Sequence, residues 1–98
     1  MLYKVNDEIV LREIGGFFFL INPKLSYNSD AEDIFQTNEV GALIWNCIED
    51  GDNIMRITQK VFLAIDDEKT PALVSAITED VCEFMSVLCR QGFVQEIG

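Results

Sequence analysis

The sequence contains no histidine, and its 98 residues include only 3 cysteines and 2 prolines. Without an imidazole, a zinc site would need at least one carboxylate among its ligands, so metal binding is not expected. Cys47, Cys82 and Cys89 are odd in number and lack the Cys-x-x-Cys spacing. This usage is typical of reduced cysteines that pack inside a cytosolic protein. We therefore expect a cytoplasmic protein with no metal ion and no cofactor.

Long apolar runs are also missing. None approaches the roughly 18 residues that a membrane-spanning helix needs, and the first four residues lead into charged side chains. Such a beginning does not resemble a secretion signal. A hydrophobic content of 49% with 24% charged residues is ordinary for a globular protein. We expect one domain over residues 1–98, without contact to a membrane.

Basic side chains are scarce, because 7 of them face 17 acidic ones and leave a net charge of −10. This balance opposes binding to the phosphates of nucleic acids and to anionic membranes. Two interpretations remain. The charge serves only to keep a small domain soluble, or it forms an acidic surface that attracts a basic peptide or a basic face of an enzyme.

The residue patterns of catalysis are absent as well. There is no nucleophile-elbow motif and no glycine-rich loop to hold a phosphate, and a cysteine nucleophile would lack a histidine base. Glu79 and Glu83 share one face of a predicted helix, but they have no neighbouring partner for acid–base chemistry. The sequence does not predict an enzyme.

Two β-rich runs, Ile9 to Ile14 and Phe17 to Asn22, flank the pair Gly15-Gly16. A glycine pair between such runs predicts a hairpin with a two-residue turn. The resulting register pairs Ile14 with Phe17, Arg12 with Phe19 and Val10 with Ile21. Both faces of the hairpin are then largely apolar, although an open antiparallel sheet usually has one wet face. Either a neighbouring molecule covers part of one face, or residues Leu2 to Val5 or the following loop fold over it.

The next segments alternate clear start and stop signals. Asn22-Pro23 ends the second strand, a polar loop follows to Glu32, and Asp33 to Gln36 is a short third strand. That strand leads without a linker into a helix from Glu39 to Glu49, with Asn38 as its N-cap and Gly51 marking its end. We expect the strand edge to be held rigidly beside the helix.

Two more helices follow. Asp52 or Asn53 caps the second, which runs to about Leu63. Thr70 followed by Pro71 starts the third, which continues to about Gln91 before Gly92. Phe93, Val94 and Ile97 then form a short final strand or a packed tail. The order predicts an α+β, winged-helix-like fold, in which an N-terminal three-stranded antiparallel sheet is followed by three helices.

At about 100° per residue, the third helix divides into stripes. An apolar stripe predicted to be core contains Val74, Ile77, Val81, Phe84, Met85 and Leu88. Beside it lies a stripe of small side chains: Ser75, Thr78, Cys82, Ser86 and Cys89. Glu79, Asp80 and Glu83 lie further round, toward solvent. The small residues indicate either a place where another helix packs, or one wall of a groove beside the edge of the third strand.

The whole pattern resembles the PqqD-like proteins, the recognition elements for precursor peptides of ribosomal peptide natural products (RiPPs). The shared features are a glycine turn between apolar strands, a strand running into QTNEVGALIW, two further helices and a closing GFV. The likeness extends from about Ile9 to Val94. It depends on the order and spacing of all these features, and not on a single motif. The long loop before the third strand is a departure from the family.

The resemblance implies a non-catalytic module that captures the leader region of a precursor peptide as an added strand. The leader would lie between the third strand and the third helix and be presented to a tailoring enzyme, such as a radical-SAM maturase, a cyclodehydratase or a leader peptidase. The positions that match the peptide-binding site are Asp33, Ile34, Phe35 and Gln36 on the strand, and Thr78, Cys82, Met85, Ser86 and Cys89 on the helix.

Two alternatives come from other classes. A hairpin with three helices is also the fold of winged-helix DNA-binding proteins, but recognition of DNA needs a basic helix. Here the last helix carries Glu79, Asp80 and Glu83 against a single terminal Arg90. The apolar sheet also leaves open a homodimeric scaffold, which is compatible with peptide capture on a different surface.

Overall fold

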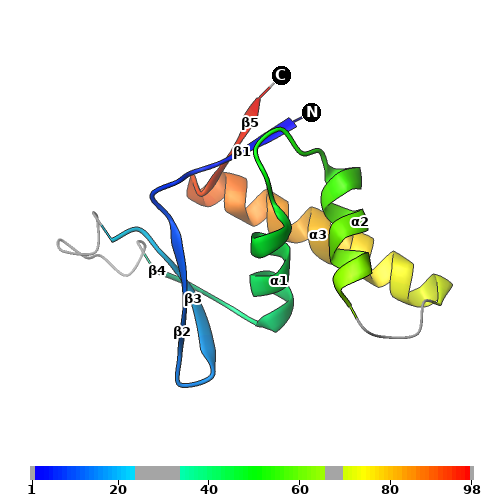
Figure 1. The fold of residues 1–98 in the computed structure, drawn as a ribbon, viewed down its shortest axis with the longest axis horizontal. Helices are drawn as coiled ribbons and strands as arrows, with labels where there is room; N and C mark the ends of the chain where they lie inside the picture. The colour runs from blue at the N-terminus through cyan, green and yellow to red at the C-terminus, as the bar shows by residue number, and fades with distance from the viewer. Residues whose placement is uncertain (1, 24–33, 66–69, 98) are drawn as a thin grey trace.

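The computed structural model describes residues 2–23, 34–65 and 70–97. The elements are β1 (Leu2–Val5), β2 (Val10–Ile14), β3 (Phe17–Ile21), β4 (Ile34–Thr37), α1 (Glu39–Cys47), α2 (Ile54–Ala64), α3 (Pro71–Gln91) and β5 (Val94–Ile97). Figure 1 shows the sheet β2–β3–β4 on one side of the helices, with α3 crossing behind α1 and α2. The predicted α+β fold, an antiparallel three-stranded sheet followed by three helices, is confirmed.

The hairpin β2–β3 has the predicted register, in which Ile14 pairs with Phe17 and Val10 with Ile21. Gly15 and Gly16 form its turn with φ of 59° and 85°, a left-handed backbone that glycine adopts without strain. On the other side of β3, Leu20 pairs with Phe35 and Phe18 with Thr37, so β4 is antiparallel to β3. The strand begins at Ile34, and the predicted strand residue Asp33 lies outside the described residues.

The predicted caps of the helices are confirmed. The side chains of Asn38, Asn53 and Thr70 accept hydrogen bonds from first-turn backbone N–H groups at 2.8, 2.9 and 3.1 Å. Gly92, with φ of 78°, ends α3. The predicted end of α1 was wrong, because the helix stops at Cys47 and Ile48 is already extended. The N–H of Glu49 donates instead to the side chain of Asp52.

The core lies where α3 meets the other two helices and the inner face of the sheet. Its completely buried side chains are Leu20, Ile44, Ile57, Val61, Val81, Met85 and Leu88. The predicted apolar stripe of α3 is therefore confirmed for Ile77, Val81, Met85 and Leu88. It was wrong for Val74, which is 42% exposed near the start of the helix, where it borders a surface hollow beside Phe62 and Leu63 of α2.

The first strand does not fold over the sheet as one interpretation of the sequence required. Instead β1 pairs antiparallel with β5, with Tyr3 opposite Glu96, at the top of the molecule in Figure 1. The other edge of β1 also has backbone partners, because Tyr3 donates to Asp52 and accepts from Gly51, both at 2.8 Å. The predicted final strand is thus confirmed, and its partner is the N-terminal segment.

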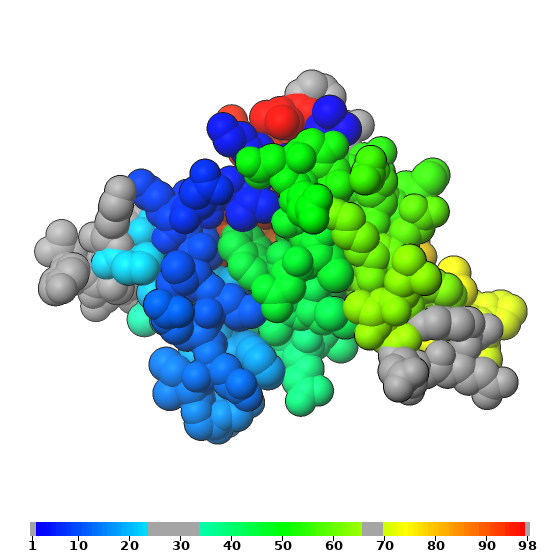
Figure 2. Space-filling model, in the orientation of Figure 1, coloured from blue at the N-terminus to red at the C-terminus, as the bar shows by residue number. Residues whose placement is uncertain are grey.

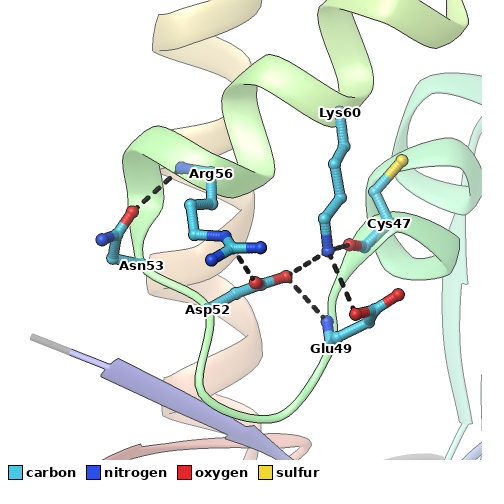
Figure 3. Close-up of polar contacts among 6 residues, drawn as sticks. All are labelled: Cys47, Glu49, Asp52, Asn53, Arg56 and Lys60. Atoms are coloured by element: carbon cyan, nitrogen blue, oxygen red, sulfur yellow. Dashed lines mark hydrogen bonds and ion pairs between the residues drawn. The ribbon is translucent and has the colours of Figure 1, made fainter.

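The loop between α1 and α2 is fixed by one buried carboxylate, that of Asp52 (Figure 3). It accepts hydrogen bonds from Lys60 Nζ at 2.5 Å and from the N–H of Glu49 at 3.0 Å, and it lies 3.4 Å from Arg56 Nε. Burial works to raise the pKa of Asp52, but these hydrogen bonds and charges prevail and lower it. The carboxylate therefore links the loop, and through it β1, to α2.

Figure 2 shows the near face of the molecule, where the hairpin β2–β3 lies beside α1 and α2 lies on the other side of α1. The side chains of the sheet that point away from the core include exposed apolar ones. Ile14 is 60% exposed, Phe17 56% and Ile34 41%. None of the helices within the described ranges is both long and apolar enough to cross a membrane.

Candidate functional site

The candidate site starts at the free edge of β4. The strand order β2–β3–β4 places β4 at the end of its sheet, and within the described part of the chain it pairs only with β3. In an antiparallel strand, alternate residues direct their N–H and C=O groups away from the existing partner. The outer edge of β4 therefore presents backbone donors and acceptors to a further strand.

A groove lies between this edge and α3. From β4 and the start of α1 it is lined by Phe35, Thr37, Asn38, Val40, Gly41 and Ile44, and from α3 by Asp80, Glu83, Phe84 and Val87. The direct passage from strand to helix at Asn38 sets the angle between the two lining segments. Because the cap fixes this junction, the edge of β4 is held at a defined place beside α1.

Two aromatic rings hold the strand against the helix. The rings of Phe35 and Phe84 lie 6.3 Å apart between centroids, at 51°. Phe35 also meets Phe93 in a T-shaped contact with centroids 6.2 Å apart. Aromatic pairs at such separations add to the stabilisation from apolar burial. The floor of the groove is therefore firm and apolar.

Gly41 allows this close approach. A Cβ atom at this position would collide with the Oγ1 of Thr37 and would lie 3.1 Å from Thr37 Cβ and 3.2 Å from Phe84 Cε1. The glycine is needed here for space, at the point where β4, α1 and α3 come together. Its N–H donates to the capping side chain of Asn38 at 2.8 Å, so one residue serves both the cap and the packing.

The predicted strand residues are only partly directed into the groove. Phe35 lines it, whereas Ile34 and Gln36 do not, since successive side chains of a strand point to opposite faces. Ile34 is 41% exposed on the outer face, and Gln36 is also exposed. An added strand would still meet the backbone of both residues.

The predicted residues of α3 lie elsewhere. Met85 is 1% exposed and belongs to the core, as the apolar stripe predicts, and its side chain does not line the groove. Thr78 and Cys82 border one shallow hollow on the exposed side of the helix. Cys82 and Ser86 border a second one, which shares Glu83 and Val87 with the groove. Cys89 is half-buried; burial and, to a smaller extent, the charge of Glu96 raise its pKa.

The sequence did not predict the α3 residues that line the groove. The face of α3 that meets β4 is rotated about the helix axis relative to the predicted stripe of small residues. Asp80, Glu83, Phe84 and Val87 occupy it. These residues repeat at i, i+3, i+4 and i+7, which is the spacing of one helix face. The pattern is visible in the sequence, but the two acids had been assigned to solvent and Phe84 to the core. The assignment of the acids to solvent and of Phe84 to the core both hold in part, because the groove lies at the boundary between the solvent-exposed and the core side of α3.

Comparison with known proteins fits this architecture. The family model described as "Coenzyme PQQ synthesis protein D (PqqD)" matches residues 25–94. The chain belongs to this family, as the resemblance had indicated. Among curated proteins, none has significant sequence similarity to the chain.

A solved structure shares the fold. It is described as "TbiB1 in Complex with the TbiA(beta) Leader Peptide", and it aligns with a TM-score of 0.62 over 97% of this chain and 98% of its own. The two chains are 18% identical. At this identity the alignment establishes a common fold, in a protein that was solved with a leader peptide.

Proposed function

We propose that the protein is a non-catalytic binding module that captures the leader region of a ribosomal precursor peptide and presents it to a tailoring enzyme. The observation that carries the proposal is the outer edge of β4, which has no strand partner among the described residues, beside a groove walled by α3. The family and the fold shared with TbiB1, which was solved with a leader peptide, support it.

The capture would proceed by strand addition. An extended peptide forms main-chain hydrogen bonds with an exposed edge, and side chains at alternate positions enter pockets that give specificity. Each hydrogen bond contributes only about 0.5–1.5 kcal/mol net. Contacts of the leader peptide with Phe35, Ile44 and Phe84 in the groove would therefore supply much of the affinity. They would also set the register in which the peptide pairs with β4.

Binding of DNA is disfavoured by the charge of α3. Its exposed residues include Glu79, Asp80 and Glu83, and Asp80 and Glu83 line the groove itself. Phosphates would be repelled from this surface. We expect no electrophoretic shift of duplex DNA even at low salt, where electrostatic attraction is strongest.

The test is isothermal titration of the full chain with the leader half of the precursor peptide encoded beside its gene. We expect saturable binding to one site. A matched peptide, N-methylated at alternate residues along its length, loses the backbone donors of one strand edge. Two such peptides with opposite phases of methylation should differ sharply, because only one phase blocks the bonds to β4.

Absence of binding to the unmodified leader at millimolar peptide would overturn the proposal. Equal binding of both methylated peptides would contradict strand addition in particular. The choice of partner enzyme, whether a radical-SAM maturase, a cyclodehydratase or a leader peptidase, is tested by adding each purified candidate to the loaded complex. Light scattering of the free protein tests the alternative of a homodimer.

A further inference from the structure

The groove between β4 and α3 carries charge of one sign. Its lining includes the carboxylates of Asp80 and Glu83, and neither lysine nor arginine is among its lining residues. Within the described part of the chain, neither carboxylate forms an ion pair. By contrast, the acidic groups of Glu49 and Asp52 both have Lys60 as a partner. The groove therefore holds two acidic side chains that form no ion pair with the described residues, and the nearest basic side chain on α3, Arg90, borders the neighbouring hollow together with Glu83.

The two carboxylates are placed next to the apolar floor. Asp80 and Glu83 are three residues apart on α3, so they are neighbours on its surface, and Phe84 is four residues beyond Asp80 on the same face. One helical turn advances by about 5.4 Å. In an extended guest strand, side chains on one face recur at roughly 6.6–6.8 Å. In a bound strand that runs along α3, an apolar side chain over Phe35 and Phe84 would place the side chain two residues away near the two acids.

We infer that the groove selects a basic peptide, with an apolar or aromatic residue over Phe35 and Phe84 and a lysine or arginine two residues away that faces Asp80 and Glu83. This inference rests on the proposed strand addition and adds the chemical class of the guest. It also assigns part of the acidic surface of the protein to the peptide. Charge that lines a cleft raises the local concentration of an oppositely charged ligand.

The carboxylates of Asp80 and Glu83 also act against acidic peptides. A peptide with aspartate or glutamate at the facing position meets two like charges beside a low-polarity floor formed by Phe35, Ile44 and Phe84. Discrimination by an unfavourable charge contact is a common way to separate similar partners. The main-chain hydrogen bonds at the edge of β4 would form with any extended peptide and give no sequence preference. The carboxylates of Asp80 and Glu83 would supply that preference.

The experiment is a selection of mRNA-displayed peptides with twelve randomised residues on the purified full chain. A parallel selection uses the double variant Asp80→Asn/Glu83→Gln, which keeps the size of both side chains and removes their charge. A second double variant, Asp7→Asn/Glu79→Gln, makes the same change in charge at exposed positions outside the groove. Amide exchange of Ile34–Thr37 reports whether an enriched peptide occupies the edge of β4.

We expect enriched peptides to carry lysine or arginine two residues from an apolar or aromatic one and to slow exchange in β4. Their affinity should fall roughly tenfold in the groove variant, as for two partly exposed ion pairs, and less than twofold in the control variant. Enriched peptides that protect β4 but lack basic residues, or that bind the groove variant equally well, would overturn the inference and leave the proposed function intact. Enrichment of no peptide at all would overturn both.

Discussion

The rings of Phe35 and Phe84 lie 6.3 Å apart, and this contact joins the edge strand to the last helix. The two residues are far apart in the sequence and belong to different elements, β4 and α3. Their contact closes the bottom of the groove, and within the described part of the chain the outer edge of β4 pairs with no further strand. The relationship explains how one surface offers both backbone groups and an apolar pocket.

Phe84→Ala should weaken binding of a leader peptide at least tenfold, because it removes the helix side of the apolar floor. The ring is only half-buried, so unfolding should become easier by less than the roughly 3–5 kcal/mol typical of a fully buried phenylalanine. Titration at a temperature where the variant is folded separates the two effects. Phe17→Ala removes an equal ring at a position 56% exposed at the hairpin turn and serves as the control. Equal weakening by both variants would contradict the role of the groove.

Amide exchange in β4 should change in an alternating pattern when a leader peptide binds. The N–H groups of Ile34–Thr37 that point to β3 are already bonded and should exchange slowly in the free protein. The alternate groups, which point to the free edge, should exchange fast and become protected by the guest. Exchange measured by NMR with and without peptide tests this. Protection of all four amides in the free protein would show that the edge is already occupied.

Gly41→Ala should destabilise the fold by about 1–3 kcal/mol, because the added methyl group collides with the side chain of Thr37 and approaches Phe84. Thermal or denaturant unfolding measures the loss. Adding Thr37→Ala removes the Oγ1 atom that the new methyl group meets and should restore part of the stability. A double-mutant cycle gives the coupling between the two sites. Purely additive effects would contradict the steric explanation.

Asp52→Asn should lower the free energy of unfolding at neutral pH by about 1.5–3 kcal/mol, the value typical of hydrogen bonds to a charged group. The pKa of Asp52 is lower in the folded protein than its ordinary value. Its contribution is therefore complete above the unfolded pKa, near 3.9, and is lost as the pH falls through the folded pKa. Unfolding followed from pH 7 to pH 2 should show a smaller acid-induced loss in the variant.

The exposed Asp7→Asn variant is the control for this change, since Asp7 lies on the surface. It should keep the acid profile of the natural protein. An Asp52→Asn variant with an unchanged profile would mean that the hydrogen bonds from Lys60 and Glu49 contribute nothing to folding.

Met85→Ala and Cys82→Ala should differ strongly in their loss of stability, because one residue belongs to the core side of α3 and the other to its exposed side. Met85 is completely buried, so its truncation should cost about 2–5 kcal/mol. Cys82 is exposed, and its change should stay within about 0.5 kcal/mol. Denaturant unfolding of both variants gives the comparison. A stable Met85→Ala variant with impaired peptide binding would restore Met85 to the site.

The sequence by itself determined the elements and their order, because their signals are local. The Gly15-Gly16 turn fixed the hairpin register, and the caps at Asn38 and Thr70 fixed two helix starts. For the second helix the sequence left Asp52 and Asn53 as candidates, and Asn53 is the cap. A cap or a turn depends on a few neighbouring residues, so it can be recognised without the rest of the chain. The apolar stripe of α3 was recognised for the same reason, except at Val74.

Only the tertiary structure decided which face of α3 meets β4, and therefore which residues line the groove. The rotation of a helix about its axis is set by packing against all its neighbours at once, and here the contacts of Phe84 with Phe35 turn Asp80 and Glu83 toward the strand. The pairing of β1 with β5 was likewise beyond the sequence, since it joins residues at opposite ends of the chain. Local sequence patterns predict the helices and strands, whereas contacts between distant residues determine how these elements are arranged.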